Sequence, residues 1–136
     1  MKKFIISAMI ISMALFYLPA CKKSDKKQTT IEKIQGKWQL VTDVENDHID
    51  GQDDITTYTG DPGDIIDFRA DGKAYFNIIG TGDMDTLAYT VSGDTKIEFE
   101  GTQFDIITLT PNLFVLHDKE IIAGSDFFEE TITLKK

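Results

Sequence analysis

From Lys37 onward, apolar and polar side chains alternate with a period of two residues, the spacing of a β-strand that buries one face. Trp38, Leu40, Thr42 and Val44 share one face of the first such segment. Turn signals rich in glycine, asparagine and aspartate divide the rest of the pattern at close intervals. The alternation therefore predicts eight strands, at residues 37–44, 64–69, 73–79, 85–91, 95–100, 103–109, 112–118 and 126–134.

The connections between successive predicted strands are short, with one exception, which favours an antiparallel meander of sequence neighbours. A flat meander leaves two unpaired edges, and closing it into a barrel removes both. We therefore expect an all-β fold, an eight-stranded antiparallel up-and-down β-barrel, while a two-sheet sandwich fits the same strand pattern. Thr29 and Glu32 have the spacing of a capping box, so a short N-terminal helix over 31–34, ended by Gly36, should precede the barrel.

The exception is the connection over residues 45–63, ENDHIDGQDDITTYTGDPG, which has no clear periodic element. Connections of this length in a small domain are commonly functional or mobile, so we expect a long loop that forms a lid or side wall at one mouth of the barrel. Its carboxylates, with Asp43 just before them, are oxygen ligands of the kind that Ca²⁺ prefers. Their spacing does not match an EF-hand, and a solvated acidic loop is the simpler interpretation.

The first 20 residues have the layout of a secretory signal rather than of a folded domain. Met1-Lys2-Lys3 supplies a basic start, and the next 15 residues form an apolar run, shorter than the roughly 20 residues that cross a bilayer. Leu18-Pro19-Ala20-Cys21 resembles a bacterial lipobox, at which the signal is cleaved and the cysteine is acylated. A retained anchor helix is the alternative. The predicted parts are a lipoprotein signal peptide, a lipidated tether and a β-barrel domain, at residues 1–20, 21–30 and 31–136.

Cys21 is the only cysteine, so the chain forms no internal disulfide, and acylation would remove a thiol that is a liability in an oxidising compartment. The expected partner is therefore a membrane, reached through the lipid on Cys21, with four lysines in residues 22–27 near the headgroups. Residues 31–136 carry 22 acidic and 8 basic side chains, a net charge of −14. Such a domain lacks the basic footprint that nucleic acid requires.

Gly36-Lys37-Trp38, a Gly-x-Trp that opens the first strand after a short helix, resembles the first motif of the lipocalins. The later order of elements, through Tyr89-x-Val91-Ser92-Gly93 to a closing Thr131-Ile132-Thr133-Leu134-Lys135, is similar to that of lipocalin-like lipoproteins of Bacteroidota. The resemblance covers about residues 31–136 and implies a barrel whose closed end is plugged by Trp38. In lipocalins an arginine after the last strand meets this tryptophan.

Arg69, the only arginine, lies in the second predicted strand, so Lys135 or Lys136 would have to replace the lipocalin arginine. The resemblance also implies an outer-membrane lipoprotein. Members sent to the cell surface often carry an acidic run after the lipidated cysteine, whereas lysines follow Cys21. This difference favours the periplasmic face of the outer membrane.

The chain contains no recognisable catalytic or cofactor-binding motif. It has no Gly-x-Ser-x-Gly, no phosphate-binding loop of the Walker type, and no free cysteine once Cys21 is acylated. His48 and His117, the only histidines, lack metal-ligand spacing. We therefore expect no enzyme activity, no cofactor and no metal site, although carboxylates from different strands could still converge.

Glu130 shares a face of the last predicted strand with Ile132 and Leu134. If that face points inward, a carboxylate enters the barrel and needs water, a partner or a ligand. A bulge, or a position at the wet end of the barrel, would remove this need, and the pattern does not decide between them. Glu130 is the predicted ligand contact, together with the inward candidates Tyr89 and Phe76.

Most of the other inward candidates are large side chains, which favours a packed core or a shallow cup over a deep cavity. Two functions stay open. The first is reversible sequestration of a small, partly apolar molecule at the open mouth of the barrel. The second is an envelope interaction module, a solid barrel that contacts another protein through its acidic loop or an exposed strand edge.

Overall fold

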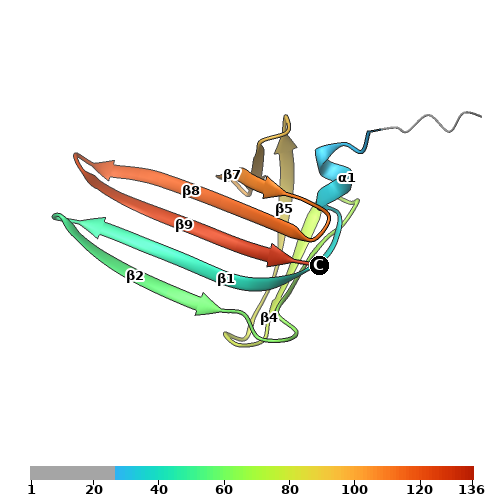
Figure 1. Ribbon diagram of the computed structural model, residues 1–136, viewed down its shortest axis with the longest axis horizontal. Coiled ribbons are helices and arrows are strands. Elements are labelled where there is room, and N and C mark those ends of the chain that lie inside the picture. Colours follow the sequence, from blue (N-terminus) through green and yellow to red (C-terminus); the bar gives the residue numbers. More distant parts are fainter. Residues whose placement is uncertain (1–26) are drawn as a thin grey trace, which may run out of the picture.

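The computed structural model describes residues 27–136, so the predicted signal peptide and Cys21 lie outside the described residues. A short helix, α1 (Thr30–Ile34), precedes a sheet of nine antiparallel strands (Figure 1). The strands are β1 (Gly36–Ile49), β2 (Gln52–Thr59), β3 (Ile65–Phe68), β4 (Lys73–Ile78), β5 (Asp83–Ser92), β6 (Lys96–Phe99), β7 (Thr102–Leu109), β8 (Leu113–Ala123) and β9 (Asp126–Lys135).

The sheet closes on itself because β1 pairs with both β3 and β9. Gln39 marks the closure, since it pairs with Ile65 on one side and with Lys135 on the other. Eight strands, β1 and β3 to β9, thus form a closed antiparallel barrel in which each strand neighbours the next. The predicted eight-stranded barrel is confirmed, and the sandwich is excluded.

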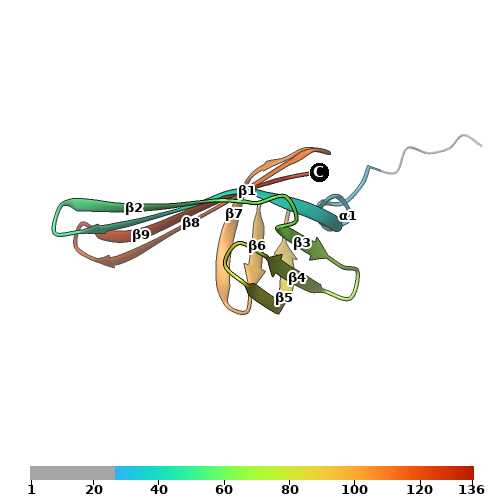
Figure 2. The same ribbon diagram turned by 90° about the horizontal axis from the view of Figure 1, so that it is seen from below.

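Four strands continue past the barrel as a flat projection, in the order β2, β1, β9 and β8 (Figures 1 and 2). We call this projection, residues 42–59 and 117–132, the blade. Residues 45–63 were expected to form a long loop, and this expectation is wrong. β1 runs on to Ile49, and a turn at Asp50 and Gly51, with φ of 52° and 75°, starts β2.

The closed end of the barrel lies next to α1, where the capping box of Thr29 and Glu32 is formed as predicted. Trp38 is fully buried there, and its ring lies 5.4 Å from that of Phe114. The indole Nε1 donates a hydrogen bond to the carbonyl oxygen of Ile34 at 2.6 Å, which fastens the helix over the core. In residues 27–136, no helix has the length and apolar character needed to span a membrane.

Candidate functional site

An apolar pocket of about 270 Å³ lies within the barrel, and we call it the cup. It is lined by Ile66, Phe68, Phe76, Leu87, Phe99, Thr102, Phe104, Leu116, Glu130 and Ile132. Eight of these ten side chains are apolar, and Glu130 is the only charged one. The expectation of a shallow cup above a filled core agrees with this volume, because the large side chains of Trp38 and Phe114 occupy the core below.

A β-bulge at Val41 decides which side chains of β1 face the same side as the cup. Leu40 pairs with Leu134, but Thr42 pairs with Thr133, so one extra residue enters β1 between them. Beyond the bulge, Asp43 lies opposite Ile132 and therefore shares its inward face. The expectation that Thr42 and Val44 continue the face of Trp38 and Leu40 is wrong for this reason.

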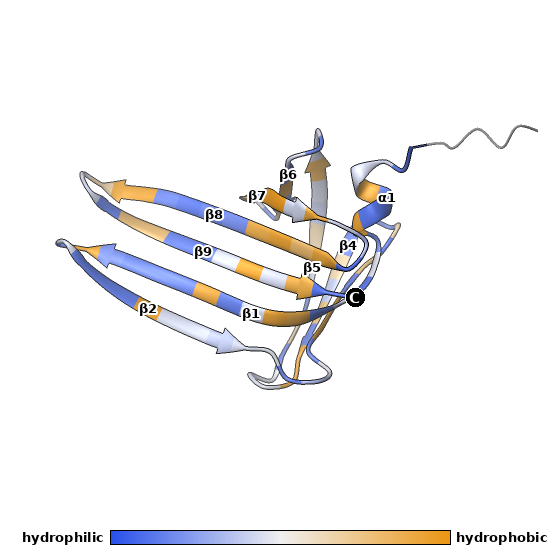
Figure 3. Cartoon of the chain, in the orientation of Figure 1, coloured by the Kyte–Doolittle hydropathy of each residue, from blue (hydrophilic) through white to orange (hydrophobic). Residues whose placement is uncertain are grey.

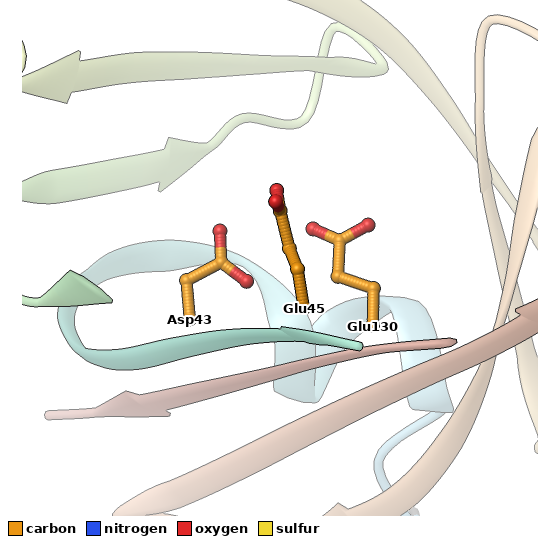
Figure 4. Close-up of side chains that lie close together, drawn as sticks. All are labelled: Asp43, Glu45 and Glu130. Atoms are coloured by element: carbon orange, nitrogen blue, oxygen red, sulfur yellow. The ribbon is translucent and has the colours of Figure 1, made fainter. Parts of the chain in front are cut away.

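The same register brings three carboxylates together at the root of the blade. Glu45 pairs with Glu130, and Asp43 is two residues away on β1, so all three point to one side of the sheet (Figure 4). One oxygen of each lies within 4.8 Å of the others. We call Asp43, Glu45 and Glu130 the carboxylate cluster. Glu130 belongs to the cup as well, so the cluster forms the polar end of an apolar pocket.

Burial and mutual repulsion disfavour the charged state of this cluster. Removal from water, with the charge of Glu45 added, raises the pKa of Asp43 from 3.8 to about 6. Removal from water and the charges of Asp43, Glu45 and Asp118 raise the pKa of Glu130 from 4.5 to about 7. A hydrogen bond between Asp43 and Glu130 adds to the rise for Glu130. It requires one proton between the two groups.

The described protein supplies no positive charge to this cluster. None of the ion pairs formed by residues 27–136 includes Asp43, Glu45 or Glu130. Oδ1 of Asp43 is also buried from solvent and has no hydrogen-bond partner. A buried oxygen without a donor is costly, which further disfavours the charged form of Asp43.

The two faces of the blade differ in charge. Strand pairing places four more carboxylates on the face of the cluster, Asp47, Asp54, Asp118 and Glu120. The basic side chains lie on the opposite face, where each has a local partner. His48 lies 2.7 Å from Asp53, and Lys119 lies 3.6 Å from Glu129. The cluster therefore stands at the root of a face on which the charged side chains are acidic.

The structure brings two of the predicted ligand contacts together, because Phe76 and Glu130 both line the cup. Tyr89 lies elsewhere: it is buried, its ring packs edge-on against Phe68, and its hydroxyl donates to the carbonyl oxygen of Arg69 at 3.0 Å. Since its polar atom is already bonded within the core, Tyr89 serves the packing of the barrel rather than the cup.

Trp38 lies away from the cup, at the closed end. The Nζ atom of Lys136 lies 4.3 Å from the centre of its ring and also donates to the carbonyl oxygens of Lys33 and Gln35. Lys136 thus occupies the place of the lipocalin arginine. The sequence pattern groups Asp43 and Glu45 with an acidic loop, and it carries no signal for the bulge that turns them toward Glu130.

The arrangement can hold a cation beside an apolar surface. Three carboxylates can accept hydrogen bonds from an ammonium group or bind a metal ion. Ca²⁺ takes about 6–8 oxygen ligands, so with one oxygen from each carboxylate the rest of its shell would be water. The residues that line the cup include no serine, cysteine or histidine.

A sequence model of the lipocalin-like domain matches residues 34–116, which is more than half of the chain. The match takes in β1 to β7 and the first residues of β8, including the bulge at Val41 and most residues that line the cup. No curated protein gave a significant match to the chain.

Proposed function

Because the chain belongs to the lipocalin-like domain family, we propose that it is a non-catalytic binding protein whose cup sequesters a small, partly apolar molecule. The observation that carries this proposal is the cup itself, in which eight of ten lining side chains are apolar. Its volume of about 270 Å³ lies just below the roughly 300–1,000 Å³ of sites for drug-sized molecules. The ligand is therefore small, or only its apolar part enters.

Removal of apolar surface from water would drive binding, at about 25 cal/mol for each Å² buried. The cup is built from strands paired on both sides, so the site is largely formed before the ligand arrives. In the blade, β1 and β9 are each paired on both sides. The blade therefore acts as a fixed wall beside the cup rather than as a lid.

A blocked cup tests this function. Leu87→Trp should fill the cup and abolish binding of a neutral fluorescent probe, N-phenyl-1-naphthylamine, because the indole occupies the same space. Ile107→Trp is the matched control, since Ile107 is 59% exposed and does not line the cup. Native mass spectrometry of protein purified from its own membranes should also find one small molecule repeatedly. This molecule should accompany the wild type and Ile107→Trp and be absent from Leu87→Trp. Equal probe binding by both variants would reject the cup as the site.

We further propose that the protein is an outer-membrane lipoprotein, anchored at Cys21 and facing the periplasm. The lipobox-like Leu18-Pro19-Ala20-Cys21 and the lysines that follow support this placement. An alkyne analogue of palmitate should label the wild type and not Cys21→Ala. Protease added to intact cells should leave the protein whole, and its removal would place it on the cell surface.

The blade favours a second candidate function, contact with another envelope protein. Ile55, Ile121 and Ile122 are 62%, 62% and 56% exposed, and apolar residues mark the far ends of β1 and β8 (Figure 3). β2 also leaves one edge unpaired along its whole length. A photocrosslinker placed at Ile55 should capture a specific partner in cells if this function operates. A crosslinker at Thr90, exposed on β5 of the barrel, is the control.

A further inference from the structure

The cup has one polar wall, and that wall is anionic. Glu130 is its only charged lining residue, and Thr102 is the only other polar one. A purely apolar ligand would leave Glu130 facing hydrocarbon, which disfavours its charged form. A ligand with an anionic head would meet Glu130 and, beside it, Asp43 and Glu45, and would be repelled. The cup therefore favours a ligand that places a hydrogen-bond donor or a positive charge next to Glu130.

No basic side chain of the described residues forms an ion pair with the cluster. The basic side chains of the blade lie on its opposite face, paired with Asp53 and Glu129. On the cluster's own face the neighbours from β8 and β2 are Asp118, beside Glu130, and Thr56, beside Glu45. The buried Oδ1 of Asp43 has no donor. This unpaired oxygen adds to the cost of the negative charge in the cluster.

We propose that the ligand is an organic cation, with an apolar body in the cup and an ammonium group held by Asp43, Glu45 and Glu130. This inference rests on the proposed binding function and adds the chemical class of the ligand. An ammonium group has three donors, which matches three carboxylates that each place one oxygen within 4.8 Å of the others. Hydrogen bonds between charged groups are among the strong ones, and the apolar wall beside Glu130 limits competition from water.

An organic cation fits this site better than a metal ion does. Glu130 contacts the apolar cup, and a bare ion would use the three carboxylates and leave the cup empty. A ligand that joins an apolar body to a charged head uses both halves of the site.

The test compares three probes of equal length, hexylamine, 1-hexanol and hexanoate, by titration of backbone amide signals in NMR spectra at pH 8. We expect hexylamine to bind about tenfold more tightly than hexanol, the gain typical of a charge-assisted hydrogen bond, and hexanoate to bind most weakly. Glu130→Gln should remove most of the advantage of hexylamine over hexanol, because the charged partner of the ammonium group is lost. Glu120→Gln, on the same face but farther along the blade, should preserve the advantage.

The outcomes separate this inference from the function on which it rests. Equal binding of hexylamine and hexanol in the cup would overturn the cationic ligand and leave the binding function standing. If none of the three probes bound, and Leu87→Trp changed no probe signal, both the binding function and the cationic ligand would be rejected. Calcium chloride that displaces hexylamine from the wild type supports a shared cation site. Tight calcium binding that depends on Glu130, without any preference for the amine, would replace the proposal with a metal site.

Discussion

The hydroxyl of Tyr58 donates a hydrogen bond to Oδ2 of Asp64 at 2.6 Å, and this bond fastens the end of β2 to the loop that leads into β3. Asp64 is completely buried, and it also accepts bonds from the backbone amides of Asp61 at 2.7 Å and Ile79 at 2.7 Å. The bond from Tyr58 is the main reason that the pKa of Asp64 is lowered. One carboxylate thus joins the root of the blade to two turns of the barrel.

We predict that Asp64→Asn destabilises the fold and loosens β2. The backbone amide of Gly80, at 3.4 Å, is a fourth donor to this carboxylate. An amide offers one acceptor oxygen where the carboxylate offers two, so at least one of the four donors loses its partner in a buried site. The melting temperature should fall by about 5–10 °C at pH 7. Hydrogen exchange should speed up first in β2. Asp61→Asn, at an exposed position in the same loop, is the control.

The effect of Asp64→Asn should depend on pH in a defined direction. A carboxylate whose folded pKa is depressed stabilises the fold above its unfolded pKa of 3.8, and this contribution is lost as the pH falls through the lower folded value. The melting temperatures of wild type and variant should therefore converge in strong acid. A constant difference from pH 7 to pH 2 would contradict the role of the charge.

The barrel could be predicted from sequence because its strands bury one face. Ile66 and Phe68 in β3, and Ile97 and Phe99 in β6, are buried while their neighbours are not, so the alternation is visible. Burial of alternate residues fixes the register, and short turns fix the order of the strands. The capping box at Thr29 was equally visible, because it depends on two residues in one short segment.

The blade and the carboxylate cluster could not be predicted in the same way. β2 is exposed at every residue except Tyr58, so its sequence carries no alternation to show a strand. The cluster depends on the bulge at Val41, a single extra residue that reverses the face of Asp43 and Glu45. The alternation in β9 leaves the orientation of Glu130 open, and its two partners come from β1, at least 85 residues earlier in the chain.

We predict that Lys136→Met destabilises the closed end of the barrel by about 1 kcal/mol, measured by urea unfolding. The ammonium group lies over the indole of Trp38 and donates to the carbonyl oxygen of Gln35 at 3.1 Å, whereas methionine keeps only the apolar contact. Lys135→Met is the matched control, since Lys135 has neither contact. Equal losses for the two variants would show that charge alone, and not this geometry, stabilises the end.

We predict that Gly60→Ala destabilises the junction of blade and barrel by about 2 kcal/mol, the scale of overpacking. A Cβ atom at Gly60 would lie 2.2 Å from the carbonyl oxygen of Leu40, next to the bulge at Val41, and backbone there has little freedom to shift. Gly51→Ala is the comparison, because its φ of 75° is strained but nothing lies within 4 Å. A smaller loss at Gly60 than at Gly51 in urea unfolding would contradict this close approach.

Finally, Glu130→Gln should stabilise the protein above neutral pH. A carboxyl group whose folded pKa is raised binds its proton more tightly in the folded state, so stability falls as the pH rises from the unfolded value of 4.5 to the folded value of about 7, and the loss is complete above it. Glutamine cannot ionise and also removes a charge beside Asp43, whose pKa is raised to about 6. Both groups are only half-buried, so water screens part of the effect, and we expect a gain in the free energy of unfolding of about 1 kcal/mol at pH 8 and almost none at pH 4.

The midpoints of urea unfolding at pH 8 and pH 4 measure this gain for Glu130→Gln. Glu120→Gln, on the same face but exposed, should leave the pH dependence of the wild type intact. Parallel pH curves for the wild type and Glu130→Gln would show that the cluster stores no such repulsion.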